Sequence, residues 1–243
     1  MRNVRTSKKI RERLIEDKQR FYACDNISKY VDEKDRESLI EEAEHGFDLV
    51  LDALLIDTKN DPNSQGTARR LAKMYINELL AGRFDKEPVI TSFPNFTTTY
   101  DHSNPLAGPE LVETKNYTGM LVVRAEIRSL CSHHFQPVVG TAYIGIIPDR
   151  NVLGLSKYIR IAQHLARRGT LQEELCQAIR LEVSKRTGTK NVAVYIEATH
   201  GCCENRGVGV SNSMTQTISL GGNFLTDVLN KNEFFENIKL QKL

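Results

Sequence analysis

The sequence predicts an α+β fold, and two observations carry that prediction. Apolar residues recur every three to four positions in the first third of the chain, as in amphipathic helices. In four later segments they recur at every second position, as in half-buried strands, and a pair of helix-like segments separates the first two from the last two. The predicted architecture is therefore two antiparallel strand pairs that flank a helix pair, preceded by N-terminal helices.

The composition fits a globular protein that works in the cytoplasm. Of the 243 residues, 40% are apolar and 26% are charged. No apolar run reaches 18 residues and the N-terminus is charged, so we expect neither a membrane span nor a secretory signal. The net charge of +2 gives no argument for a nucleic-acid partner. Five cysteines are an odd number and make a poor disulfide framework, which leaves thiols for metal binding or catalysis.

Residues 1–30 form a predicted basic N-terminal arm, and residues 31–243 form the main domain. The first 20 residues concentrate positive charge, and we interpret them as a solvated, partly helical arm in preference to a tail that binds polyanions. The basic residues are Arg2, Arg5, Lys8, Lys9, Arg11, Arg13, Lys18 and Arg20.

The helical part of the main domain covers residues 31–90. Helical periodicity runs over 34–57, and the turn-rich stretch TKNDPNSQG then interrupts it. Thr67 can cap the next helix, which is expected to end near Gly82. Residues 92–119 hold three prolines, two glycines and little periodicity, so they predict a long loop.

The predicted core covers residues 120–243. Alternating apolar residues predict its strands, and capping residues with glycine stops predict its helices. The expected strands lie at 120–130, 138–148, 191–200 and 211–222; the expected helices lie at 159–169, 170–188 and 224–235.

Cysteine and histidine gather at the ends of two predicted strands. Residues three apart in a regular strand point to opposite faces, but a turn between strands lets Cys131 and His134 converge. A second cluster, HGCC, covers 200–203 at the end of another strand. Zinc binds thiolate and imidazole, and catalytic sites leave one position to water.

Cys131, His134 and either Cys202 or Cys203 would make such a site, with His133 and His200 beside it as groups that titrate near neutral pH. The same residues also fit a structural zinc site, or buried thiols with two hydrogen-bonded histidines.

Several linked motifs resemble the GTP cyclohydrolase I family. LCSHHFQPVVGTAYIGIIP, GLSKYIRIAQHLARR, LQEEL and EATHGCCENRG follow one another like the family's C-E-H-H-F, G-L-S-K-x-x-R, Q-E-R-L and H-x-C-x-x-x-R-G. RRLAKMY at 69–75 and SLGGNF at 219–224 resemble two further family motifs. The resemblance runs from about residue 34 to the C-terminus.

This resemblance implies a zinc enzyme acting on GTP. It makes Cys131, His134 and Cys202 the zinc ligands and places Cys203 at a non-ligand position. A zinc-bound water would attack C8 of the guanine ring, formate would leave, and rearrangement would give dihydroneopterin triphosphate. His133 and His200 match the family's proton-transfer histidines.

The resemblance also assigns residues to the substrate. Gln172 and Glu173 match the pair that holds the guanine, because a carboxylate accepts two parallel hydrogen bonds from its N–H edge. From the residues alone, Thr170 and Glu173 form a capping box, in which Glu173 would bond the Thr170 N–H. The positions that match triphosphate-binding residues are Ser156, Lys157, Arg160, Arg206, Arg70 and Lys73.

The fold implied by the resemblance is the tunnelling fold (T-fold), in which subunits join side by side in an oligomeric barrel. A homodecamer of two facing pentamers is expected, with active sites at subunit interfaces. The product could serve folate or other pterin synthesis, or 7-deazaguanine synthesis.

The chain departs from the family pattern at Ser132, where the family has glutamate, and at Val208–Val210, where many members carry a charged or amide pair. The 92–119 segment is also longer than in compact members. Ser132 removes a carboxylate beside a zinc ligand. It motivates an alternative enzyme that stops at the ring-opened formamidopyrimidine nucleotide. A non-catalytic nucleotide-binding oligomer is the alternative from another class.

Overall fold

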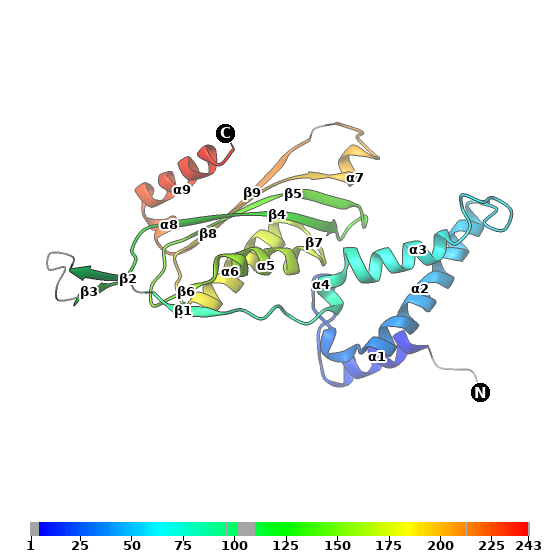
Figure 1. Ribbon diagram of the computed structural model, residues 1–243. Helices are drawn as coiled ribbons and strands as arrows, with labels where there is room; N and C mark the ends of the chain where they lie inside the picture. The colour runs from blue at the N-terminus through cyan, green and yellow to red at the C-terminus, as the bar shows by residue number, and fades with distance from the viewer. Residues whose placement is uncertain (1–4, 96, 102–109, 212, 243) are drawn as a thin grey trace. The chain divides into compact units, whose positions relative to one another are not determined.

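The structure is a computed structural model that describes residues 5–95, 97–101, 110–211 and 213–242, and it is a mixed α/β protein (Figure 1). The chain forms two compact units. The first comprises Met1–Glu87, Arg128–Val138 and His164–Thr170, and the second comprises Pro88–Ile127, Val139–Gln163 and Leu171–Leu243. The predicted boundaries of arm, helical part and core stay a prediction.

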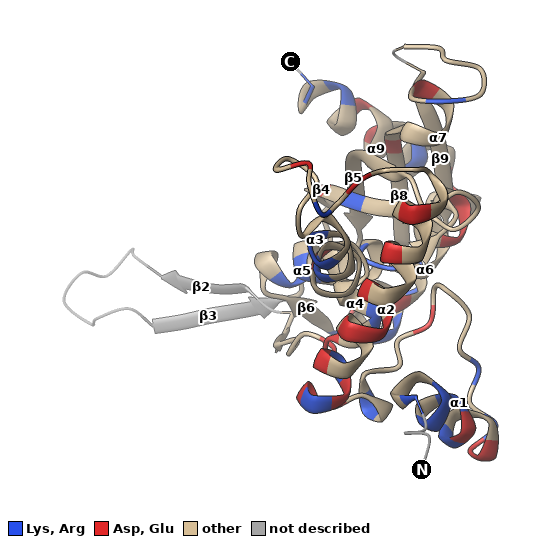
Figure 2. Ribbon diagram, turned by 90° about the vertical axis from the view of Figure 1, so that its right-hand side faces the viewer, with Lys and Arg blue, Asp and Glu red and all other residues tan. Residues whose placement is uncertain are grey.

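Helix α1 (Thr6–Glu16) lies in the basic arm and has one buried face. Its Ile10 and Leu14 pack with Ile27 in a small apolar cluster. Figure 2 shows basic residues gathered on α1 and acidic residues along α2 (Glu33–Ala53), and Arg13 of α1 pairs with Asp35 of α2 at 3.2 Å. Burial of this face supplies the packing that a short helix needs in order to be stable in water.

Helix α2 confirms the first predicted helix, and it begins at a side-chain cap. The carboxylate of Asp32 accepts a hydrogen bond from the Asp35 N–H at 2.7 Å, which satisfies one of the free donors at the helix start. Between α1 and α2 lies one short 3₁₀ turn, η1 (Ser28–Tyr30). Ile40 of α2 packs on Ala72 and Ile76 of the following segment.

The second predicted helix is divided into three pieces. It forms α3 (Thr67–Lys73), a π-helical stretch η2 (Met74–Leu79) and α4 (Ala81–Phe84). The residue that precedes the helix is Gly66, in the left-handed region at φ +69°, so the cap position is one residue before the predicted Thr67. Hydrophobic periodicity does not distinguish α from π geometry over so short a stretch.

All four predicted core strands are present, and a five-stranded sheet has the order β7–β4–β5–β8–β9. Strands β4 and β7 are parallel, and β8 and β9 are antiparallel with Ala193 opposite Leu220. The strand bounds are β4 Leu121–Cys131, β5 Pro137–Ile146, β7 Gly169–Thr170, β8 Val192–His200 and β9 Thr215–Leu220. Residue 212, inside the predicted strand 211–222, lies outside the described residues.

Two helices of the second unit contact β8 and β9 from opposite faces. Helix α6 (Gln172–Thr187) hydrogen-bonds the side chains of Thr217 and Ser219. Helix α9 (Val228–Leu240) packs its Phe234 on the other face, which carries Tyr195. Successive strand residues point to opposite faces, and Val192 to Ile196 of β8 are all buried, so both faces of this strand are covered rather than the single face that the sequence indicated. The remaining helices are α5 (Leu155–Ala166), α7 (Gly201–Glu204) and α8 (Asn223–Thr226).

The predicted loop over 92–119 was wrong in part, because this segment contains three strands. β1 (Ser92–Pro94) pairs with β6 (Asn151–Leu153), and β2 (Thr97–Asp101) pairs with β3 (Glu110–Lys115). The prolines and glycines outweighed the β-branched run TTTY in the sequence interpretation, although β-branched and aromatic residues favour strands. Residues 96 and 102–109 lie outside the described residues. Within the described residues, no helix is long and apolar enough to cross a membrane.

Candidate metal and catalytic site

A tight turn after β4 brings Cys131 close to His134. The Phe135 N–H donates to the Cys131 carbonyl at 2.8 Å, and the Cys131 N–H donates to the Gln136 carbonyl at 2.9 Å. These two bonds reverse the chain within six residues, so the predicted turn between strands is present. Cys131 is buried at the strand end, whereas His133 and His134 are exposed.

Cys131, His134 and Cys202 bring their ligand atoms together. Their sulfur and nitrogen atoms all lie within 4.8 Å of one another. Zinc bonds of about 2.0–2.3 Å in a tetrahedron place ligand atoms roughly 3.3–3.8 Å apart, so this donor set needs only a contraction of about 1 Å to hold zinc. Three protein ligands of this kind leave a fourth position for water.

Cys202 lies in α7, directly after β8, and its neighbour Cys203 is not part of this group. The sequence had left the choice between the two cysteines to the family resemblance, and the structure places the sulfur of Cys202 with Cys131 and His134. None of the five cysteines, all within the described residues, forms a disulfide. Burial raises the pKa of the Cys176 thiol to about 11, so this cysteine is inert at neutral pH.

His200 ends β8 and hydrogen-bonds the side chain of Gln172. Its Nε2 lies 2.7 Å from the Gln172 Oε1. The Gln172 amide nitrogen faces three acceptors, the carbonyls of Ile196 and Thr215 and the hydroxyl of Thr217, at 3.0–3.3 Å. The amide must therefore present its oxygen to His200, which makes Nε2 the donor and leaves Nδ1 as an acceptor.

Burial also affects the protonation of His200. Loss of solvent lowers the pKa of its imidazole below the ordinary 6.5, and the charges of Glu173 and Glu204 only partly oppose this. His200 is therefore held neutral near pH 7, with one tautomer favoured. A neutral imidazole with a free acceptor nitrogen can take a proton from a reacting group.

The start of α6 gives its two glutamates different surroundings. Glu174 accepts a hydrogen bond from the Leu171 N–H at 3.3 Å, so Glu174 and not Glu173 caps the helix. Glu173 is exposed and makes no hydrogen bond or ion pair within the described part of the chain. The capping-box alternative for Glu173 is thus excluded, and its carboxylate is available for a ligand.

The predicted phosphate-binding cations differ in how they are engaged. The side chains of Lys157 and Arg160 of α5, Arg206 after α7 and Lys73 of α3 make no ion pair or hydrogen bond with any other described residue. Arg70 instead donates to the Gln65 carbonyl and the Thr67 hydroxyl, both at 2.8 Å. Ser156 is exposed in the first turn of α5.

Two arginines close to the predicted site residues in sequence have structural partners. Arg69 pairs with Glu37 and Glu44 of α2, and Arg168 donates to the Gly82 carbonyl at 3.0 Å. Their partners lie 25 or more residues away in sequence, so no local pattern could have indicated them. Arg69 and Arg168 are accordingly poor candidates for substrate contacts.

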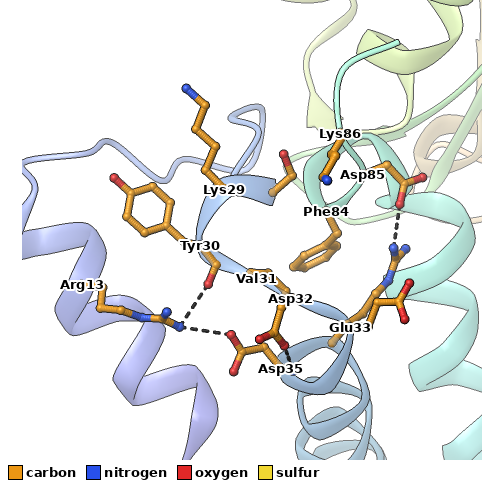
Figure 3. Close-up of a pocket in the computed structure, with 12 residues that line it drawn as sticks. Arg13, Lys29, Tyr30, Val31, Asp32, Glu33, Asp35, Phe84, Asp85 and Lys86 are labelled. Atoms are coloured by element: carbon orange, nitrogen blue, oxygen red, sulfur yellow. Dashed lines mark hydrogen bonds and ion pairs between the residues drawn. The ribbon is translucent and has the colours of Figure 1, made fainter. Parts of the chain in front are cut away.

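The hollow in Figure 3 contains none of the predicted site residues. It has a volume of about 800 Å³ in the first unit, around η1, the start of α2 and the end of α4. Three of its carboxylates are already engaged: Asp35 with Arg13, Asp85 with Arg36, and Asp32 as the cap of α2. Its unpaired lysines, Lys29 and Lys86, are exposed surface residues.

Two residues at the turn Cys131–Gln136, called the metal turn below, were not identified from the sequence. Tyr75 contacts the turn through Phe135, with its hydroxyl 3.3 Å from the Phe135 carbonyl. Phe135 has a positive φ of 51°. Both residues lie inside the quoted motifs RRLAKMY and LCSHHFQ, but only the folded structure shows that these motifs meet.

Comparison with known proteins adds independent information. Residues 43–239 match the family GTP cyclohydrolase I. The chain is 36% identical over 199 residues to the GTP cyclohydrolase 1 of Aeromonas hydrophila, covering 82% of this chain and 84% of that one. It is 36% identical over 190 residues to the GTP cyclohydrolase 1 proteins of Yersinia enterocolitica and Yersinia pestis, covering 78% of this chain and 79% of each relative.

Proposed function

The chain belongs to the GTP cyclohydrolase I family and is an enzyme of that family; from this premise we propose that it hydrolyses GTP at C8 of the guanine ring. Formate leaves, and the remaining nucleotide rearranges to 7,8-dihydroneopterin triphosphate. The observation that carries this proposal is the meeting of Cys131, His134 and Cys202 within 4.8 Å.

Those three residues are the proposed zinc ligands. When bound, zinc lowers the pKa of a coordinated water towards neutrality and so supplies a nucleophile for an amidine carbon. The donor set supports zinc over magnesium or calcium, because two sulfurs and one imidazole are poor ligands for those hard cations. Ser132, beside Cys131, contributes a hydroxyl in place of the family's carboxylate.

His200 is the proposed proton acceptor and donor during ring opening. Gln172 fixes its tautomer through the 2.7 Å bond to Nε2, which leaves Nδ1 to exchange protons with the reacting nucleotide. His133 is exposed next to the ligand His134, with the two rings edge-on at 6.4 Å. It is the proposed second proton-transfer group.

Glu173 is proposed to hold the guanine by its amino group and ring N–H. Its carboxylate is exposed, and the neighbouring Glu174 provides the helix cap. Gln172 was predicted beside Glu173 as a guanine contact. Its four hydrogen bonds to protein groups support a role in orienting His200, while its backbone N–H at the start of α6 is still offered for the substrate.

The triphosphate is proposed to bind the cationic side chains that have no ion pair or hydrogen bond within the described part of the chain. Lys157, Arg160 and Arg206 are the main candidates, with Lys73 and the Ser156 hydroxyl. Arginine donates two parallel hydrogen bonds to a phosphate, and lysine acts as a point charge. Arg70 can join them only by giving up bonds to the loop that precedes α3.

A homo-oligomer is proposed, with the T-fold barrel and decamer expected for this family. Exposed apolar residues support it, because monomers seldom leave many such residues uncovered. Those of the second unit include Ile218, Leu225, Val228, Leu229 and Leu240. The free thiols support a cytoplasmic enzyme, since thiolate ligands need a reducing compartment. Folate, other pterin and 7-deazaguanine synthesis are all possible uses of the product.

The test is turnover of GTP by the zinc-loaded protein, with formate and fluorescent pterin measured separately. The proposal predicts equal amounts of both. Consumption of GTP with neither formate nor pterin would favour the variant that stops at the formamidopyrimidine, because that product keeps C8 as its formyl group. Ser132 is the motive for this variant, and Ser132→Glu should then gain both products. Formate without pterin would mean that the reaction stops after the formyl group has been hydrolysed. Binding of GTP that stays unchanged would favour a non-catalytic nucleotide-binding oligomer.

A further inference from the structure

The metal turn contains a strained residue. Phe135 directly follows His134 and adopts φ +51°, in the left-handed region that a bulky side chain occupies only at a cost. Its ring is 38% exposed, so burial of the side chain does not explain the conformation. Strain of this kind persists only where surrounding contacts determine the backbone.

Three hydrogen bonds hold the turn in this shape. Two come from inside it, between Phe135 and Cys131 and between Cys131 and Gln136, at 2.8 and 2.9 Å. The third comes from outside, because the Tyr75 hydroxyl donates to the Phe135 carbonyl at 3.3 Å. The Tyr75 and Phe135 rings also lie in tilted contact, with centroids 6.4 Å apart.

Tyr75 is itself firmly positioned. It lies in the first turn of the π-helical stretch Met74–Leu79, a geometry that is rare and often found at functional sites. Its ring stacks on Phe47 of α2, with centroids 5.5 Å apart and an interplanar angle of 19°. The N-terminal helices thus present one hydroxyl to the backbone of the metal turn.

We propose that Tyr75 is a positioning residue for the metal site: its hydroxyl and ring hold Phe135 in the left-handed conformation that points the Cys131–His134 pair at one metal. The proposal rests on the proposed function in that it takes the turn to be a metal site. Tyr75 touches neither the ligand atoms nor the substrate in this role. It acts through the backbone of the residue after His134.

The first test is Tyr75→Phe, which removes only the hydroxyl. Hydrogen exchange of the metal-free protein should show the Cys131 and Phe135 amides exchanging about five- to tenfold faster, as expected for one lost hydrogen bond. Affinity for Co²⁺, used as a spectroscopic substitute for zinc, should fall about tenfold, with altered visible absorption bands. Unchanged exchange and unchanged Co²⁺ spectrum and affinity would overturn the proposal.

Tyr30→Phe is the matched control. Tyr30 lies in the same unit and loses a comparable hydrogen bond, to Asp17 at 2.9 Å, so it reports the effect of removing a tyrosine hydroxyl away from the turn. It should leave both exchange at the turn and Co²⁺ binding unchanged. An equal loss of Co²⁺ affinity in the two variants would mean general destabilisation and would overturn the positioning role.

A second variant tests the strain directly. In Phe135→Gly the left-handed conformation is no longer costly, so adding Tyr75→Phe in that background should reduce Co²⁺ affinity at least threefold less than it does in the parent. An equal loss of Co²⁺ affinity in both backgrounds would contradict the proposal that Tyr75 holds Phe135 in its strained conformation. Hydrogen exchange can be measured without metal or GTP, so it tests the positioning role of Tyr75 separately from the reaction. Tight Co²⁺ binding without turnover of GTP would count against the proposed reaction and would leave the positioning role of Tyr75 intact.

Discussion

At the residue scale, three successive side chains at the start of α6 have different surroundings. Gln172 is only 4% exposed and bonds His200, Glu173 projects into solvent, and Glu174 bonds the Leu171 N–H. The sequence shows a Q-E-E run at a helix start, which fits capping and ligand binding equally well. Only the position of the helix start, at Gln172 and not at Thr170, separates the two roles.

Replacement of these glutamates should therefore separate function from stability. Glu173→Gln should reduce kcat/KM for GTP more than about 100-fold, because an amide cannot accept both guanine N–H bonds, while the melting temperature stays unchanged. Glu174→Gln should lower the melting temperature by about 2 °C and keep most of the activity. Steady-state kinetics and thermal unfolding of both variants would check this, and the reverse pattern would return Glu173 to the role of helix cap.

At the element scale, α9 is fastened to the sheet at its C-terminal end. The ammonium of Lys242 pairs with the carboxylate of Glu197 and lies 5.2 Å from the centre of the Tyr195 ring and 5.8 Å from that of Tyr143. Both tyrosine hydroxyls also contact Glu197, at 3.1 and 3.4 Å. Cation–π attraction and the ion pair act on the same lysine, so the end of the helix is tied to β8.

These contacts predict that the stability of the folded protein depends on pH in the alkaline range. Burial and the neighbouring Glu197 raise the pKa of Tyr195 above its ordinary 10.0. Burial lowers the pKa of Lys242, but the hydrogen bond to Glu197 and the charges of Glu197, Tyr195 and Tyr143 together outweigh burial and raise this pKa above 10.5. A raised folded pKa stabilises the protonated folded state, and that contribution is present below the unfolded value. Stability should therefore fall as the pH rises above about 10.

Lys242→Met should loosen α9 and shift the titration of Tyr195. The positive charge of Lys242 lowers the pKa of that phenol, so its removal should move phenolate absorbance at 295 nm to higher pH. Lys239→Met is the control, because Lys239 lies in the last turn of α9, three residues before Lys242, and among the described residues it pairs only with the exposed Glu236. Identical titration curves for Lys242→Met and the parent would contradict the contact.

The elements also show what the sequence could predict. Strand β8 was predictable because the apolar residues Val192, Val194, Ile196 and Ala198 recur at every second position of the sequence. The π-helical stretch at Tyr75 was not predictable, because periodicity does not separate α from π geometry over so short a stretch. The pairing of β2 with β3 was missed because the prolines and glycines of the segment favoured a loop. The Cys131–His134 pair needed only a strand end and a turn, whereas its contact with Tyr75 needed the folded helices.

At the scale of the whole molecule, the proposed function depends on two observations, the family membership of the chain and the Cys–His–Cys group. The family match over residues 43–239 supports the proposed reaction, and the group Cys131, His134 and Cys202 is one that could hold a metal. Either observation alone would leave a different question open: a family member can lose its metal, and a Cys–His–Cys group can be purely structural.

The most direct measurement is release of formate from GTP carrying a ¹⁴C label at C8, followed as the metal-free protein is titrated with zinc. Labelled formate should rise in proportion to bound zinc and reach a plateau at a single zinc ion per chain. Cys202→Ser should lose both zinc binding and turnover, and Cys203→Ser should keep both. Formate release by the zinc-free protein, or loss of zinc in Cys203→Ser but not in Cys202→Ser, would contradict the proposed function.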